Sequence, residues 1–147
     1  MLMRNYFVAI FLQPFYFRVA SLLQNFIHMK TKFWLKDPED HDYIAALDFL
    51  ELLYTPEQAA SYVEKLKNTS TVVKKSKDIL RASQLQLLPK ENVHVKNDIQ
   101  KVKKGKKMSP ILIVQDQKLV IADGYHRLCS IYYLSEDWEV PCRLAHT

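Results

Sequence analysis

Glycine is rare in this chain, which has only two glycines in 147 residues. Average usage of about 7% would give roughly ten, so each glycine is expected to meet a backbone demand. Gly124 stands in the run Ile121-Ala-Asp-Gly-Tyr-His-Arg127. The apolar run 118–121 before it is typical of a buried strand, and the apolar residues after it recur at helical spacing. Gly124 is therefore predicted at a strand-to-helix junction.

Such a junction is a candidate anion site. The first N–H groups of a helix have no partner within the helix and lie at the positive end of its dipole. Glycine lets the backbone approach a ligand closely, and His126 and Arg127 would add donors beside it. The alternative is a tight turn in which Asp123 caps the helix while His126 and Arg127 are solvated.

The composition is that of a globular chain, with 48% hydrophobic and 25% charged residues. The net charge of +5 is mildly basic and too small to require a nucleic acid as partner. Cys129 and Cys142 fall in a predicted helix and a predicted strand. We expect them to be small apolar core residues of a protein in the reducing cytoplasm.

Residues 1–28 differ from the rest because they contain no acidic residue. Their longest uninterrupted apolar run, residues 6–12, is too short to span a bilayer. Met29 begins a more ordinary sequence. Three interpretations stay open: an extension upstream of the natural start, a helix that touches a surface or membrane, and an export signal.

Residues 29–69 are predicted to form a helical hairpin. Asp37 is placed to cap the first helix, with Pro38 at its first position, and this helix is expected to run to about Tyr54. Thr55-Pro-Glu-Gln58 restarts the chain with a capping box. So short a turn makes the two helices roughly antiparallel, and the pair needs a partner surface.

Residues 70–147 are predicted to form the main domain, an α+β fold. Gly105 is placed to end a helix in a left-handed cap. Pro141 argues for an edge or irregular strand, because proline cannot donate to a neighbouring strand. The expected order is strand 69–73, helix 78–82, helix 95–102, strand 110–114, strand 118–122, helix 125–134 and strand 138–144.

A basic patch surrounds the predicted helix that ends near Gly105. It comprises Lys96, Lys101, Lys103, Lys104, Lys106 and Lys107. One interpretation is a solvated face with cations near a helix C-terminus, and the other is a surface that attracts phosphates. His94 begins this helix, either as a surface histidine or as a ligand contact.

These motifs together resemble the ParB/sulfiredoxin superfamily over about residues 70–144. The resemblance lies in the helix before Gly105, the strand Pro110-Ile-Leu-Ile-Val114, the hairpin and the 121–127 motif. Small bacterial ParB-like proteins are similar from near Met29 onward. The resemblance implies a small mixed sheet with helices, preceded by a helical hairpin. It also implies a phosphate or nucleotide at the helix start.

The resemblance places Gly124, His126 and Arg127 on the phosphate-handling positions of the sulfiredoxin Gly-Cys-His-Arg motif. Tyr125 takes the place of the catalytic cysteine, and a phenol cannot replace a thiolate as sulfur nucleophile, so sulfiredoxin activity is not expected. In partition proteins the matching Gly-Glu-Arg-Arg motif binds CTP. Tyr125 and His126 replace its Glu and first Arg, which leaves phosphate binding expected and CTP selectivity open. A serine-kinase branch shares the Asp-Gly and the closing Arg.

The sequence thus predicts a nucleotide- or phosphoester-binding protein, with phosphoryl transfer or nucleotide hydrolysis as its candidate reactions. Asp123 and His126 are the candidate catalytic groups, and Gly124, Tyr125, His126, Arg127 and His94 the candidate phosphate contacts. Mg²⁺ is expected only with a nucleotide, since no metal-binding motif is present. The alternatives are a nucleic-acid-associated module or nuclease that uses the lysines, and a non-catalytic interaction domain.

Overall fold

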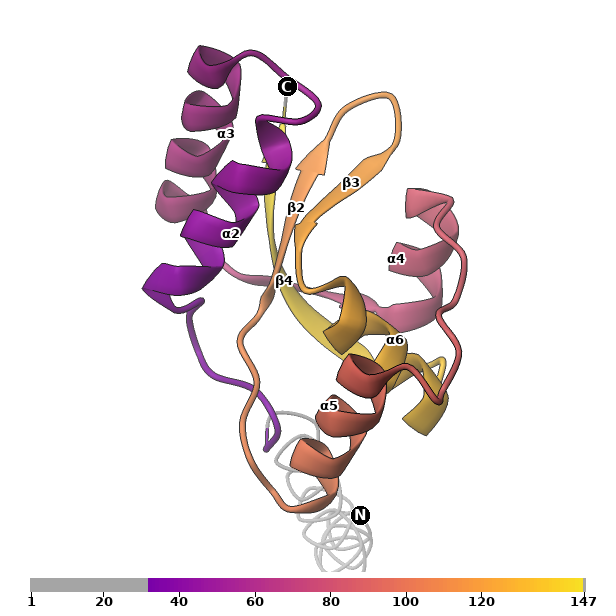
Figure 1. Ribbon diagram of the computed structural model, residues 1–147. Coiled ribbons are helices and arrows are strands. Elements are labelled where there is room, and N and C mark those ends of the chain that lie inside the picture. Colours follow the sequence, from indigo (N-terminus) through magenta and orange to yellow (C-terminus); the bar gives the residue numbers. More distant parts are fainter. Residues whose placement is uncertain (1–31, 147) are drawn as a thin grey trace, which may run out of the picture. The chain divides into compact units, whose positions relative to one another are not determined.

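The computed structural model describes residues 32–146. The predictions for residues 1–28 lie outside these residues. In the described part, five helices surround a four-stranded mixed sheet (Figure 1), which confirms the predicted α+β fold. The elements are α2 (Asp40–Leu50), α3 (Pro56–Asn68), β1 (Val72–Lys75), α4 (Ser76–Ser83), α5 (Val93–Lys103), β2 (Ile111–Gln115), β3 (Leu119–Asp123), α6 (Tyr125–Leu134) and β4 (Glu139–His146).

The sheet has the strand order β1-β4-β2-β3. β2 and β4 are parallel, and the other two pairs are antiparallel. β2 is central, as predicted, but the edge position inferred from Pro141 is wrong because β4 lies between β1 and β2. Pro141 pairs with Val73 of β1, whereas the pairing of β4 with β2 begins one residue later, at Cys142. The missing N–H therefore falls where β4 has one neighbour.

Successive side chains of β2 pack alternately into two separate hydrophobic cores. Ile111 and Ile113 pack in the core shared with α4 and α6, and Leu112 and Val114 pack in the core shared with α2 and α3. All four side chains are fully buried. This strand is buried on both faces, as its continuous apolar run predicts. Figure 1 shows the result as the α2–α3 pair on one side of the sheet and α4, α5 and α6 on the other.

The helical hairpin begins differently from the prediction. α2 starts at Asp40 with Glu39 as its cap, and it ends at Leu50 rather than near Tyr54. Asp37 is not the cap, because its carboxylate binds the Arg143 guanidinium of β4 at 2.7 Å. The capping box at Thr55 is confirmed, since both of its hydrogen bonds are present.

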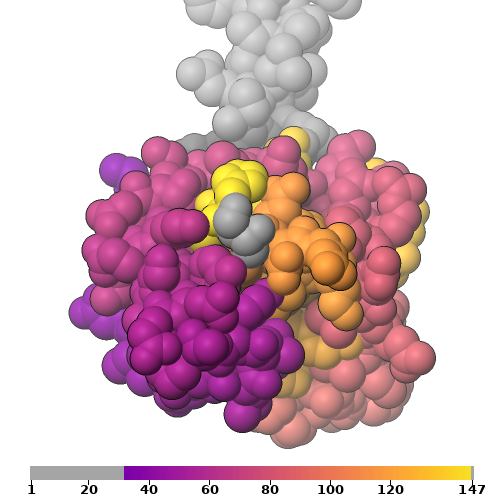
Figure 2. All heavy atoms as spheres, turned by 90° about the horizontal axis from the view of Figure 1, so that it is seen from above, coloured from indigo at the N-terminus to yellow at the C-terminus, as the bar shows by residue number. Residues whose placement is uncertain are grey.

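Polar contacts fix the helical hairpin to β4 and to the β2–β3 turn. Arg143 donates to the Tyr43 hydroxyl at 2.9 Å and to the Lys67 carbonyl at 2.8 Å, so β4 also caps the end of α3. The Tyr54 hydroxyl donates to Asp116 in the β2–β3 turn at 3.1 Å. Figure 2 shows the end of β4 (yellow) between the helical hairpin (purple) and the β2–β3 hairpin (orange).

Three further expectations concern single positions. Cys129 and Cys142 are buried and unpaired, which confirms their place in the core. Gly105 follows α5 with φ +69°, which confirms the left-handed cap. Among the described residues, no helix combines the length and the apolar character needed to cross a membrane.

Candidate functional site

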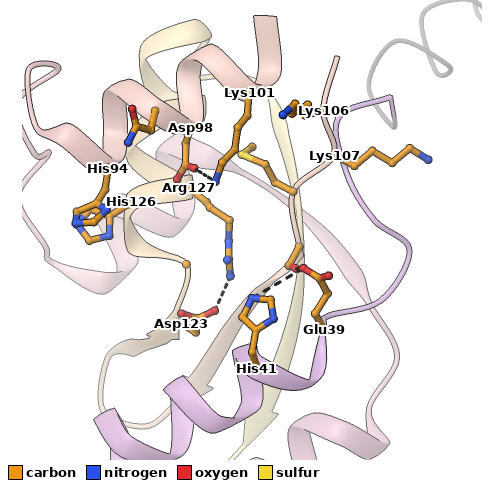
Figure 3. A pocket seen from close by; sticks show the side chains of 14 residues that line it. Glu39, His41, His94, Asp98, Lys101, Lys106, Lys107, Asp123, His126 and Arg127 are labelled. Carbon is orange, nitrogen blue, oxygen red and sulfur yellow. Dashed lines mark hydrogen bonds and ion pairs between the residues drawn. The ribbon is translucent and has the colours of Figure 1, made fainter. Parts of the chain in front are cut away.

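A pocket of about 450 Å³ opens at the start of α6 (Figure 3). Three segments that are far apart in the sequence form its walls: the entry to α2, the α5 helix with the loop after it, and the β3–α6 junction. The lining residues are Glu39, His41, His94, Asn97, Asp98, Lys101, Lys106, Lys107, Met108, Ser109, Asp123, Gly124, His126 and Arg127.

Gly124 forms the junction between β3 and α6. It is the N-cap of α6, with φ +99°, a conformation that residues with a Cβ rarely adopt. The N-cap Gly124 provides no side-chain cap, and the Asp123 carboxylate binds the Arg127 guanidinium, with no hydrogen bond to the first N–H groups of α6 among the described residues. The start of α6 therefore offers the pocket free N–H groups at the positive end of the helix dipole.

Arg127 does not point into solvent, so the alternative of a solvated Arg127 at this turn is wrong. Its side chain is only 17% exposed, and its two terminal nitrogens bind Asp123 at 2.6 Å and Asp42 at 3.2 Å. A Cβ on Gly124 would lie 3.0 Å from the Arg127 Nη2 atom. The close approach that glycine permits here is thus made by the arginine of the chain itself.

Asp42 and Asp123 share the guanidinium of Arg127. Asp42 comes from α2, and its carboxylate is 1% exposed. Burial works to raise the pKa of Asp42, but the attraction of Arg127 and nearby hydrogen bonds hold this pKa below its usual value. Burial raises the pKa of Asp123 despite the same arginine. Asp42 is therefore the member of the pair that holds the negative charge more firmly.

Three of the five histidines of the chain line the pocket. His94 of α5 and His126 of α6 lie against each other, with ring centroids 4.7 Å apart. Burial, together with repulsion from His94, lowers the pKa of His126. Figure 3 shows His41 on the other wall, near Glu39. The pocket therefore contains imidazoles on two sides, with His126 favouring its neutral form.

The predicted basic patch divides into two groups. Lys101 and Lys106 lie at the upper side of the pocket, whereas the Lys107 side chain points away from it (Figure 3). Lys101 binds Asp98 at 2.8 Å. The other three lysines are exposed and do not line the pocket: Lys96, Lys103 and Lys104.

Tyr125 also lies outside the pocket lining, although it belongs to the 121–127 motif. Its ring packs against the apolar cores beside α6. Its hydroxyl donates to the Gln86 carbonyl. Tyr125 therefore holds the loop before α5 against α6 and does not line the pocket, unlike the other residues predicted with it.

Among the described residues, one group of three has ligand atoms close enough to share a metal ion. Glu39, His41 and Asp42 bring these atoms within 4.8 Å of one another. However, Asp42 already accepts from Arg127 through one oxygen and from the Glu39 backbone N–H through the other. This trio is therefore an ion-paired wall of the pocket, and a metal would have to compete with Arg127 for it.

Comparisons with protein families, with curated proteins and with solved structures find no match for this chain. The ParB/sulfiredoxin resemblance thus stays a prediction from the sequence motifs. The geometry stands independently of this resemblance: His94, Lys101, Lys106, Asp123, Gly124, His126 and Arg127 line one pocket.

Proposed function

We propose that the pocket at the start of α6 binds a nucleotide or another phosphoester. The observation that carries this proposal is the uncapped start of α6, which opens into a pocket with three imidazoles and a lysine-bearing wall. Free helix N–H groups and cationic side chains are the groups that bind phosphate oxygens in proteins. The pocket volume, about 450 Å³, is within the usual range for small-molecule sites.

The residues divide into direct contacts and supporting residues. His94, Gly124 and His126 line the pocket, and the first N–H groups of α6 together with the two imidazoles would hold the phosphate. Arg127 also lines the pocket, but its terminal nitrogens are already paired with two carboxylates, so its role is to support the site. Mg²⁺ would arrive with a di- or triphosphate and be held chiefly by the phosphate oxygens.

A hydrolytic or phosphoryl-transfer step would need a proton acceptor near the phosphate. Asp123 is poorly suited, since its carboxylate is bonded to Arg127 at 2.6 Å and burial raises its pKa. His126 is better suited because burial keeps its pKa low, so its ring is neutral near pH 7. We therefore propose His126 as the group that accepts and returns protons in any such reaction, and Asp123 as a positioning residue.

Calorimetric titration with ATP, ADP, CTP and GTP in the presence of Mg²⁺ tests the binding proposal. We expect at least one to bind with Kd below about 1 mM, roughly the weakest affinity that counts as recognition. His126→Gln should weaken that binding at least tenfold, whereas His146→Gln, at the exposed end of β4, should not change it. Failure of all four nucleotides to bind would contradict the proposal.

The exposed lysines separate this proposal from nucleic-acid binding. A triple variant with alanine at Lys96, Lys103 and Lys104 removes the lysines of the basic patch that do not line the pocket. We expect its nucleotide affinity to equal that of the parent protein. RNA or DNA retardation at about 50 mM salt that disappears in this variant would favour a nucleic-acid surface instead.

The cellular location is also a proposal. The two cysteines are buried and unpaired in the described structure, which is compatible with the reducing cytoplasm that the sequence predicts.

A further inference from the structure

The fixed charges around the pocket cancel. Four cations and four carboxylates belong to its lining or lie directly behind it: Lys101, Lys106, Lys107 and Arg127, and Glu39, Asp42, Asp98 and Asp123. Lys101 is bonded to Asp98, and Arg127 to both Asp42 and Asp123. A phosphate that enters this pocket therefore meets no surplus of permanent positive charge from these groups.

The histidines are the groups that can adapt their charge. His94 and His126 lie in contact, with ring centroids 4.7 Å apart. Without a ligand, protonating both rings would place two positive charges side by side, and the lowered pKa of His126 reflects this repulsion together with burial. An anion beside both rings would reverse this balance, since an opposite charge within about 4–6 Å favours the protonated form.

We infer that the pocket holds a terminal phosphate group as a dianion beside the His94–His126 pair and takes up a proton on His126 as it binds. This inference rests on the proposed function, because it assumes that the phosphate lies at the start of α6. It adds a ligand class, since a phosphomonoester carries a second charge that a diester lacks. It also predicts a pH dependence, because the affinity for the dianion becomes stronger as the pH falls from about 8 to about 6.

The neighbouring charges act on this His94–His126 pair from every element around the pocket. They are Asp98 and Lys101 on α5, Asp123 on β3, Arg127 on α6, Glu39, His41 and Asp42 at the start of α2, and Lys106 and Lys107 before β2. The pKa of His126 is raised by Asp98 and Asp123 and lowered by His94 and Arg127, while burial lowers it most. The carboxylates, the lysines and the arginine among these groups do not change their charge near neutrality, so the pH dependence falls to the imidazoles.

Sulfate is the suitable probe because it keeps two charges at every pH of interest, so every proton taken up belongs to the protein. We expect NMR titration to show a higher pKa for His126 at saturating sulfate than without it. Affinity measured at constant ionic strength should weaken up to tenfold for each pH unit and each proton between about pH 6 and pH 8.

Matched variants keep the two proposals distinguishable. The double variant His94→Gln/His126→Gln, checked for folding by circular dichroism, should lose the pH dependence and bind sulfate at least tenfold more weakly at pH 6. Adenosine 5′-monophosphate should bind more tightly than its 5′-methyl ester, which carries one charge less. Sulfate binding that does not depend on pH, or an unchanged His126 pKa, would overturn this inference while nucleotide binding stood. Absence of both sulfate and nucleotide binding would overturn both proposals.

Discussion

Arg127→Ala is expected to destabilise the protein by about 3–5 kcal/mol, as removal of one partner from a buried ion pair generally does. The variant leaves Asp42 with 1% exposure and without its cation, and it leaves Asp123 without the partner at 2.6 Å. This expectation opposes the interpretation of Arg127 as a solvated phosphate contact, for which alanine would leave the fold intact. Urea denaturation monitored by circular dichroism measures the free energy of unfolding directly.

Arg81 provides the matched control for this variant. Arg81 binds Asp78 at 3.1 Å within α4, but its side chain is 85% exposed. Arg81→Ala should therefore cost no more than about 0.5–1 kcal/mol, as exposed pairs usually do. If the two arginine variants lose equal stability, Arg127 is not a buried structural cation. Combining Arg127→Met with Asp42→Asn and Asp123→Asn should restore part of the loss, since no unpaired charge then stays buried.

The role of Arg127 changes how binding data on this motif should be interpreted. A loss of nucleotide binding in Arg127→Ala would follow from disruption of the β3–α6 junction even if the guanidinium never touched a ligand. His126 is a better test of contact, because it lines the pocket and forms no ion pair with any of residues 32–146. It is partly buried there.

Local signals in the sequence were sufficient for most of the elements. The capping box at Thr55, the left-handed position of Gly105 and the strand-to-helix junction at Gly124 all depend on residues within a few positions, and each is confirmed. Pro141 misled because its effect depends on where a neighbouring strand begins to pair. Asp37 misled because a distant arginine binds the carboxylate that local spacing assigns to a helix cap.

The site was predictable only in part, because some of its residues follow from local sequence signals and others come from distant parts of the chain. His126 and Gly124 follow from the junction itself, whereas Asp42 reaches the junction from 85 residues away. A signal for Asp42 did exist in the sequence. It lies on the same buried face of α2 as Tyr43, Ala46 and Leu50. A carboxylate on a core-facing stripe requires a buried cation, although the stripe alone does not identify that cation as Arg127.

Gly124→Ala is expected to cost about 2–4 kcal/mol, from a left-handed backbone that disfavours a Cβ by about 1–2 kcal/mol and from a steric conflict of about 1–3 kcal/mol. The new Cβ would lie 3.0 Å from both Arg127 Nη2 and Ile111 Cγ1. The arginine cannot yield easily, because Asp42 and Asp123 hold it. Gly105→Ala is the control, since Gly105 has φ +69° but no atom within 4 Å of the added Cβ.

The difference between the two glycine variants isolates the contact with Arg127 and Ile111. Urea denaturation should show Gly105→Ala losing only the backbone cost of about 1–2 kcal/mol, with Gly124→Ala losing at least about 1 kcal/mol more. In the double variant Gly124→Ala/Arg127→Ala, the Cβ meets one neighbour fewer, so the combined loss should be smaller than the sum of the single losses. Additive losses would mean that only the left-handed backbone conformation requires glycine at position 124. A smaller combined loss would show that Gly124 is required at this position to accommodate the arginine that the two carboxylates hold.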